Sequence, residues 1–563
     1  MSKVIPVLAG LCVLAAGGAA GIYALAKKRA ESLDCHLGNA KDFKKYQSLM
    51  SEDTDENVIF GTFQGNPFGL SLDSVKTNRS TNVLTIGGSD SERKDYIKYN
   101  IMQENSSALI VDKDRTLFLN LAPKLKASGY PVYLFDLSNL HPCFSNFYNP
   151  LDYVYDEKGY VSDTDIYILT DILINPKNTG FWRKAEKAFL TALIYYVLGN
   201  DEISREDKCF ATILEKVKLA ATLTENDYFT ENDIFSEMES WMRKASQSDN
   251  EFSKRAAEQA KLNYDTFQLA SKGKLIQNIV VITEVDLMIF SEPVVSNITR
   301  TETKHPDLNI DFKKLCSQQA YLFVMVPDGD AYKRLLSLLF CQFYATAYKC
   351  GEKLLRGKYH VGHRKGLPTL ECFDSEREAM EHCKANNVYW SGDEYAGKDP
   401  ALPVHVNIFL DDFANLGELK NFTTVLATCR KYRIGNHCII NSLEELEKVY
   451  PDGEHECLIA NVDTILYFGG ENVKESDAEF IKSYLEEVDL YYKWKKVKKR
   501  YREGCEINFT PTIHSPMSTE EIFAIGKDNT DEIVMVRNWY PFVCQKCKPE
   551  NHKRYKEYHD ASK

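Results

Sequence analysis

The chain has 563 residues, of which 44% are hydrophobic, 27% charged and 12% aromatic. This balance excludes a disordered or collagen-like chain, and the length suits a globular protein of about two to four domains. The 69 Lys and Arg residues against 81 Asp and Glu give a formal net charge of −12, so any contact with nucleic acid must come from a local basic surface. The 15 scattered cysteines argue against a disulfide framework and favour a reducing compartment.

The N-terminus carries an apolar segment. Residues 4–26 contain no charge and are long enough to cross a hydrocarbon core of about 30 Å. Residues 27–29 are all basic, whereas only Lys3 precedes the segment, so the positive-inside rule places the rest of the chain in the cytoplasm. The alternative is a cleaved signal peptide, because residues 24–26 resemble a small-residue cleavage site. We expect a single-pass anchor to the cell membrane at residues 1–29.

A polar segment, 30–56, ends in an acidic run and predicts a juxtamembrane linker. After it, short apolar runs alternate with amphipathic stretches of helical length. The runs with the character of buried strands are residues 82–87, 108–112, 131–136, 320–326, 404–412, 437–441 and 464–469. Such alternation predicts an α/β fold with a mainly parallel sheet that helices cover on both faces.

Two segments interrupt this alternation. From residue 164 to residue 274 helical periodicity replaces the strand signal, which predicts an inserted all-alpha domain. Residues 352–401 form a second insertion, rich in Gly, Lys, His and Glu, to which the sequence assigns no function. The remaining expected parts are the nucleotide-binding domain at 57–163, 275–351 and 402–543, and a C-terminal tail at 544–563.

Two motifs stand at predicted carboxyl ends of strands, where open α/β sheets bind ligands. Residues 87–94, between a strand and a helix, occupy the place of a phosphate-binding loop and read G-G-S-D-S-E-R-K. Residues 407–413 form an apolar strand that ends in Asp411 and Asp412, as in a Walker B strand. Each motif alone is weak, because Gly-Gly turns are common and an acid at a strand end often caps the following helix.

Further motifs follow in a fixed order. Residues 407–430 resemble the "LLDEFANIGKIP … ATxR" signature of the type IV secretion coupling proteins, the TraG/TraD group of conjugative DNA-transfer ATPases. Other stretches resemble further motifs of that family: residues 98–103 "KPNIMQ", 149–151 "NPL", 181–186 "FWxxAE", 441–446 "QSxxQL", 461–463 "NCD" and 515–522 "LMTPDEI". This ordered set spans about residues 58–550 and is more specific than any single motif.

The resemblance implies a RecA-like P-loop NTPase core, an all-alpha domain and a membrane anchor, assembled as a homo- or hetero-hexamer. Such a ring would pass DNA with its attached relaxase to the secretion channel proteins. ATP and Mg²⁺ would be the cofactors. The roles that the resemblance implies are phosphate binding by Gly87, Gly88, Ser89, Ser91 and Arg93 or Lys94, Mg²⁺ binding by Asp411, water activation by Asp412, a sensor role for Asn441, and an arginine finger in trans for Arg430.

The phosphate-binding loop departs from the family pattern G-G-S-G-S-G-K-T. Two glycines are replaced by Asp90 and Glu92, which add bulk and repel a triphosphate. Arg93 lacks the compact ammonium of lysine, and Lys94 lacks the hydroxyl that would bind Mg²⁺. A register shifted by one residue makes Lys94 the phosphate lysine but places Asp95 at the Ser/Thr position. We therefore expect weak or absent ATP hydrolysis.

Two weaker motifs lie near the C-terminus. Residues 491–502 interleave basic and aromatic side chains, which suits either contact with nucleic acid or a solvated amphipathic element. Cys544 and Cys547, with His552 and His559 downstream, have half the spacing of a zinc site, but a second Cys pair is missing and free cysteines in a reducing cytosol need no metal.

Three hypotheses therefore remain. The first is a DNA-translocating coupling ATPase, and the second is a non-catalytic member of the same family that acts as a membrane-anchored receptor or scaffold, alone or with an intact paralogue. The third is an unrelated membrane-bound α/β regulator.

Overall fold

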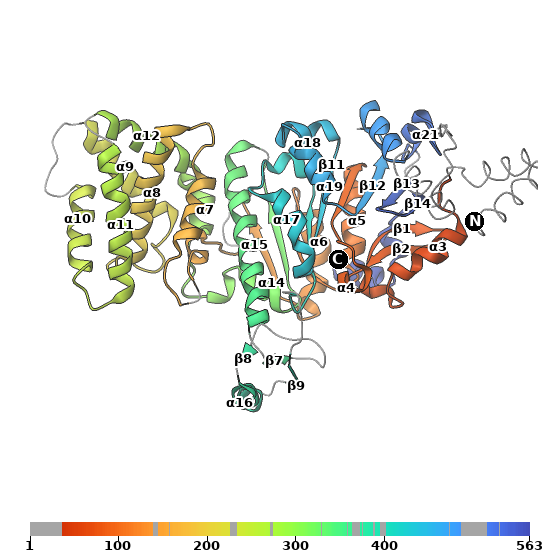
Figure 1. The fold of residues 1–563 in the computed structure, drawn as a ribbon, viewed down its shortest axis with the longest axis horizontal. Helices are drawn as coiled ribbons and strands as arrows, with labels where there is room; N and C mark the ends of the chain where they lie inside the picture. The colour runs from red at the N-terminus through yellow and green to blue at the C-terminus, as the bar shows by residue number, and fades with distance from the viewer. Residues whose placement is uncertain are drawn as a thin grey trace, which may run out of the picture.

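One large sheet organises the α/β part of the molecule. The computed structural model describes residues 36–138, 145–156, 158–225, 233–270, 274–327, 329–356, 359–362, 372–373, 375–386, 389–394, 401–471, 473–485, 515–527 and 530–562. Within these residues, the sheet has 11 strands in the order β2-β1-β14-β13-β12-β3-β11-β10-β4-β6-β5 (Figure 1).

The strands from β12 to β5 are parallel to one another. Their bounds are β3 Val83–Gly87, β4 Ser107–Val111, β5 Val132–Asp136, β6 Tyr321–Met325, β10 Val406–Leu410, β11 Ile434–Ile440 and β12 Thr464–Gly469. They coincide with the seven apolar runs of the sequence and are almost entirely buried. The prediction of an α/β fold with a mainly parallel sheet is confirmed.

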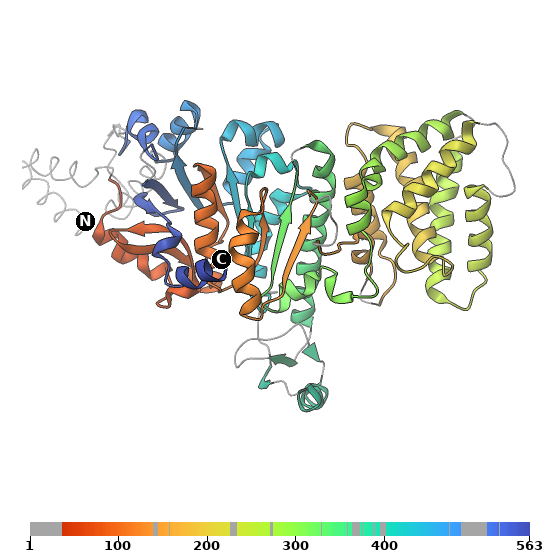
Figure 2. The ribbon, with the colours of Figure 1, turned by 180° about the vertical axis from the view of Figure 1, so that it is seen from behind.

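Helices cover both faces of the sheet. On one face lie α5 (Asp90–Ile101) and α6 (Thr116–Ala127), which Figure 2 shows in front of the strands. On the other face lie α15 (Lys333–Arg356), α17 (Phe422–Thr428), α18 (Leu443–Val449) and α19 (Glu454–Ala460). Successive strand residues point to opposite faces of the sheet. Ile110 therefore belongs to the core on the side of α5 and α6, whereas Leu109 and Val111 belong to the core on the side of α15 and α17.

The other edge of the sheet is antiparallel and was not predicted. It consists of β1 (Asn57–Phe63), β2 (Asn66–Ser71), β13 (Asp531–Val536) and β14 (Phe542–Lys546). Two further short helices, α4 (Ser74–Thr77) and α21 (Thr519–Ala524), lie close to this part of the fold in the chain and in space.

The expected linker and tail differ from the structure. Part of residues 30–56 forms α3 (Ala40–Tyr46), whose Phe43 and Tyr46 rings are buried against Phe68 and Phe542. Part of residues 544–563 completes β14 and forms α22 (Tyr555–Ala561), which packs on α6. Both segments are therefore part of the folded domain, because their few large apolar side chains pack on the face of the sheet that carries α5 and α6.

A helical block lies at one end of the molecule (Figure 1). Its helices are α7 Asp163–Leu173, α8 Gly180–Gly199, α9 Phe210–Glu225, α10 Ile234–Ala245, α11 Glu251–Ala270, α12 Lys274–Leu287 and α13 Pro293–Ile298. The short helix α14 (Phe312–Ser317) instead packs on α15 and β4 of the α/β part. The buried helix α8 is packed against α11 and α12. The helices therefore extend beyond the range of residues 164–274 that the sequence indicated.

The insertion at residues 352–401 contains a small sheet of its own. In its described parts, β7 (Tyr359–Gly362) pairs with β8 (Cys372–Phe373) and β9 (Tyr389–Glu394), next to α16 (Glu376–Asn386). This unit projects from the end of α15 (Figure 1).

The described residues include no helix that is both long and apolar enough to span a membrane. The expected span at residues 4–26 lies outside the described residues, as does the basic and aromatic stretch at residues 491–502.

Candidate nucleotide site

The turn after β3 requires its two glycines for packing. Gly87 and Gly88 have φ angles of +82° and +86°, which residues with a Cβ rarely adopt. A Cβ at Gly87 would lie 2.5 Å from the carbonyl oxygen of Gly469, and one at Gly88 would lie 2.8 Å from the ring of Phe468. The N–H of Gly88 donates to the oxygen of Gly469 at 2.8 Å. Glycine is therefore needed at both positions because β12 lies too close to this turn for a side chain.

Helix α5 begins directly after this turn. Ser89 is its N-cap: its hydroxyl accepts from the N–H of Glu92 at 3.4 Å, and its N–H donates to the Glu92 carboxylate at 2.6 Å. This capping box uses backbone donors that an anion at a helix N-terminus would need. Only Gly88 and Ser89 separate the strand from the helix, so Ser91 lies exposed in the first turn, and the chain does not form an open loop around a phosphate group.

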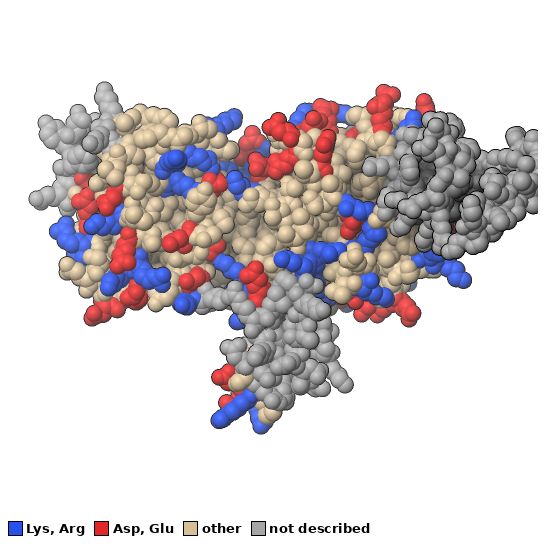
Figure 3. Space-filling view, in the orientation of Figure 1, with Lys and Arg blue, Asp and Glu red and all other residues tan. Residues whose placement is uncertain are grey.

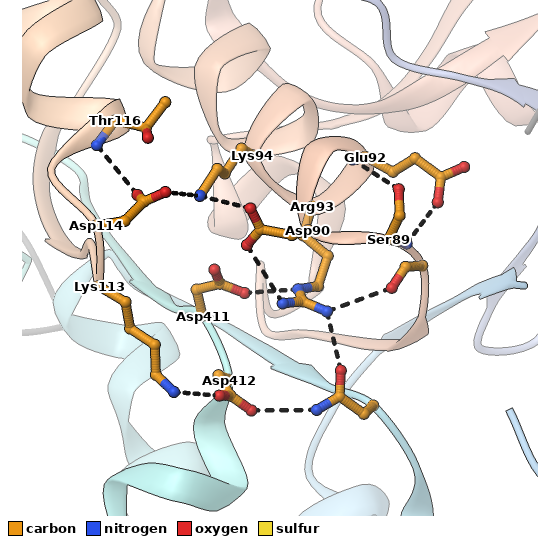
Figure 4. A network of polar contacts seen from close by, with 12 residues as sticks. Ser89, Asp90, Glu92, Arg93, Lys94, Lys113, Asp114, Thr116, Asp411 and Asp412 are labelled. Atoms are coloured by element: carbon orange, nitrogen blue, oxygen red, sulfur yellow. Dashed lines mark hydrogen bonds and ion pairs between the residues drawn. The ribbon is translucent and has the colours of Figure 1, made fainter. Parts of the chain in front are cut away.

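Arg93 lies inside the site and binds its acids (Figure 4). Its Nε donates to Asp411 at 2.9 Å, and its Nη1 donates to the side-chain oxygen of Asn441 at 2.9 Å and to the carbonyl of Gly88 at 3.3 Å. The side chains of Arg93 and Asp411 are only 10% and 4% exposed. Burial raises the pKa of Asp411 above its usual value, and Arg93 opposes this rise. The carboxylate of Asp411, to which the resemblance assigns Mg²⁺ binding, is thus already paired with the guanidinium of Arg93.

Lys94 binds Asp90 and Asp114 and forms no ion pair with Asp411 among the described residues. Its Nζ lies 2.6 Å from both Asp90 and Asp114, and its side chain is buried. Burial alone would lower the pKa of Lys94, but the hydrogen bonds to Asp114 and Asp90 outweigh it and raise this pKa. Burial would raise the pKa of Asp114, and the bond from Lys94 is the main cause that instead lowers it to about 2. The shifted register therefore offers no free lysine for a phosphate either.

Asp412 follows β10 in a left-handed conformation, with a φ of +55°. It accepts from Lys113 at 2.5 Å, Asn415 at 2.8 Å and Asn441 at 3.2 Å. Burial would raise the pKa of Asp412, but the Lys113 bond outweighs it and lowers the pKa. Lys113 and Asp114 were not predicted as site residues. Their position at the carboxyl end of β4, next to β10, is the signal that could have identified them.

Arg430 is not part of this group. It lies in the 3₁₀ turn Cys429–Tyr432, just before β11 begins, and therefore at the amino end of the parallel strands. Its Nη1 donates to the backbone and side-chain oxygens of Asn78 at 3.1 and 3.0 Å. The other implied site residues all lie at the opposite, carboxyl edge. The role in trans implied for Arg430 concerns a second subunit and stays a prediction.

The arrangement does not fit Mg²⁺ and ATP. Arg93, Lys94, Asp411 and Asp412 each bind an oppositely charged group of the same chain, and the glycine turn is closed by its contact with β12. Among the described residues there is no group of three or more His, Cys, Asp or Glu side chains placed to hold a metal ion.

The residues of the half zinc motif are engaged in contacts with other protein groups. Cys544 and Cys547 are buried, and the thiol of Cys547 donates to the carbonyl of Phe60 at 3.3 Å. His552 contacts the side-chain oxygen of Gln103 at 3.0 Å. These residues serve the packing between β1, β14 and α5.

Two solved structures illustrate what the chain is similar to. The plasmid coupling protein TrwB in complex with ADP and Mg²⁺ is 11% identical, with a TM-score of 0.48, over 91% of this chain and 93% of that chain. VirB4 of Thermoanaerobacter pseudethanolicus is 10% identical, with a TM-score of 0.45, over 87% and 96% of the two chains. No protein with a curated description matches the sequence.

The sequence match to a protein family is extensive. The model for "Type IV secretory system Conjugative DNA transfer" matches residues 42–360 and 391–488, which is well over half of the chain. This match confirms the resemblance seen in the ordered motifs and excludes an unrelated regulator. The chain belongs to the conjugative DNA-transfer family of type IV secretion systems.

Proposed function

We propose that this protein is a membrane-anchored coupling component of a type IV secretion system that does not hydrolyse ATP. It receives DNA with its attached relaxase and passes this substrate to the channel proteins, in a hexamer with its own copies or with an intact paralogue. The family match supports the role in conjugative DNA transfer. The apolar segment at residues 4–26 and the basic residues 27–29 support the anchor and the cytoplasmic position of the rest.

The observation that carries the loss of hydrolysis is the ion pair between Arg93 and Asp411. A bound nucleotide with Mg²⁺ would need Asp411, and it would have to break this buried pair. Removing one partner of a buried pair typically costs about 3–5 kcal/mol. A cost of that size weakens binding by roughly two to four orders of magnitude. Phosphoryl transfer depends on positioned cations and carboxylates, and here these groups are already paired with one another.

A titration of the purified full-length protein with Mg-ATP tests the proposal. At the candidate nucleotide site we expect no Asp411-dependent saturation below about millimolar nucleotide, and we expect no turnover. The matched control is the variant Asp90→Gly, Glu92→Gly, Arg93→Lys and Lys94→Thr, which restores the family pattern G-G-S-G-S-G-K-T and should gain affinity. Micromolar affinity of the unmodified protein that disappears in Asp411→Ala would refute the proposal.

Co-purification tests the recruiting role separately. The full-length chain, captured from cells that carry its secretion system, should retain the relaxase and channel proteins. Retention of neither protein would contradict this part of the proposal, whatever the result with nucleotide.

A further inference from the structure

A polar cleft opens at the amino edge of the parallel strands, opposite the candidate nucleotide site. Its volume is about 410 Å³, which lies within the usual range of sites for small ligands. The segments that line it are the turn after α4, the end of α17, the end of α19 and the turn after β13. In Figure 3, Lys and Arg side chains gather on this face below α19 and beside α4. We call this site the amino-edge cleft.

The charge of the amino-edge cleft is unbalanced. Among the described residues that line it, Arg79, Arg430 and Arg537 carry positive charge, and Asp463 is the one acid. Asp463 lies 3.8 Å from Arg79 and 3.5 Å from Arg537, and it also accepts from the N–H of Ser80 at 2.6 Å. One carboxylate cannot neutralise three guanidinium groups. The cleft therefore keeps an excess of positive charge that favours an anion.

Two of the arginines are held in place. Arg537 donates to the carbonyl oxygens of Ala460 and Val462, the latter at 2.8 Å. Arg79 lies next to Asp463, and its side chain is only 16% exposed. Groups that are already ordered lose little conformational freedom when a ligand binds. The ion pairs of Asp463 with these arginines also connect the start of β12 with the end of β13. A structural role therefore accounts for Arg79 and Arg537.

No structural ion pair accounts for Arg430. It is exposed, and within the described parts of the chain no carboxylate lies within ion-pair distance of it. Its contacts with Asn78 use Nη1, while a guanidinium has five N–H donors in a planar fork that matches a phosphate group. Asn78, Asn461 and Asn538 add amide side chains to the lining, which suits a polar ligand.

We propose that the amino-edge cleft binds a phosphate group between Arg430 and the ordered pair Arg79 and Arg537. The phosphate belongs either to a free nucleotide or to the backbone of single-stranded DNA, which share this chemistry. Binding needs neither Mg²⁺ nor a second subunit, because all the cations come from one chain. The site is independent of the candidate nucleotide site, which lies at the other edge of the sheet.

Calorimetric titration of the full-length protein without Mg²⁺ tests the proposal, with pyrophosphate, ADP and a short oligothymidylate as separate probes. We expect saturable binding that weakens with salt and that Arg430→Gln reduces by about tenfold or more. Arg430→Lys should give an intermediate loss, because it keeps the charge without the fork. Lys431→Gln is the matched control: the residue is adjacent and exposed but does not line the cleft.

The probes separate the two sources of phosphate. Binding of pyrophosphate and ADP identifies a free nucleotide as the ligand, and binding of the oligonucleotide alone identifies the DNA backbone. Absence of binding for all three probes, or equal binding by the unmodified protein and Arg430→Gln, would overturn the proposal. A loss caused by Asp411→Ala instead would place the ligand at the candidate nucleotide site, and would contradict the proposed function as well.

Discussion

Replacing Arg93 by methionine should destabilise the α/β core strongly. Arg93→Met keeps a side chain of similar length but removes the guanidinium, so Asp411 stays buried without its counter-ion. Loss of one partner from a buried pair costs about 3–5 kcal/mol. The substitution also removes the donor to Asn441 and to the carbonyl of Gly88. Because single domains are typically stable by about 5–15 kcal/mol, the cost is a large part of the total.

The size of this loss should depend on pH. Burial raises the pKa of Asp411, and Arg93 opposes the rise, so the folded-state pKa of Asp411 should increase further in Arg93→Met. A group whose pKa is higher in the folded state stabilises the fold below its unfolded pKa. This stabilisation is lost as pH rises through the folded pKa. The deficit of Arg93→Met should therefore be greater at about pH 8 than at about pH 5.

Urea unfolding of the full-length protein in detergent, followed by tryptophan fluorescence at both pH values, measures this difference. Arg93→Met combined with Asp411→Asn should recover most of the loss at about pH 8, since neither position of the former pair then carries a buried charge. The control is Arg377→Met, because Arg377 is 87% exposed and its pair with Glu381 contributes little. The reasoning is refuted if Arg93→Met is as stable as this control, or if its deficit does not shrink at the lower pH.

Two further predictions concern packing around the site. Both carboxyl oxygens of Glu532 lack a hydrogen-bond partner among the described residues, and burial raises its pKa well above the usual value. The unmodified protein should therefore lose stability as pH rises, while Glu532→Gln should lose less, as melting curves at neutral and alkaline pH can show. Gly88→Ala should cost about 1–3 kcal/mol more than Gly129→Ala in urea unfolding, because the two glycines have similar positive φ angles but only Gly88 meets a ring, that of Phe468. Equal costs would show that the contact with Phe468 does not matter.

The parallel strands could be predicted because each is an apolar run buried on both faces. The antiparallel edge could not, because its strands carry residues that break this pattern. Gly61 lies at a bulge in β1, and Glu532 lies buried within β13. The place of β1 in the sheet depends on a partner far away in the chain, as the pairing of Gly61 with Lys546 shows.

The meeting of residues 87–94 with Asp411 could also be predicted. β3 and β10 both lie beside β11 in the sheet, so their carboxyl ends share one edge. The pairing of the charges could not be predicted, because spacing in the sequence does not decide which acid receives which cation. The sequence suggested that Arg93 and Lys94 face a phosphate, whereas the structure pairs them with Asp411 and Asp114.

The four altered residues of the loop act together. Asp90 would repel a nucleotide, but here it accepts from Lys94 and lies 3.6 Å from Arg93. Glu92 closes the capping box of α5 and binds Lys546. Each acid that stands where the family has a glycine therefore pairs with a cation of the same chain. These pairs neutralise the negative charge of the loop. A single reversion would leave one of these charges without its partner. We therefore expect that restoring nucleotide binding requires all four changes together, and that no single one of them suffices.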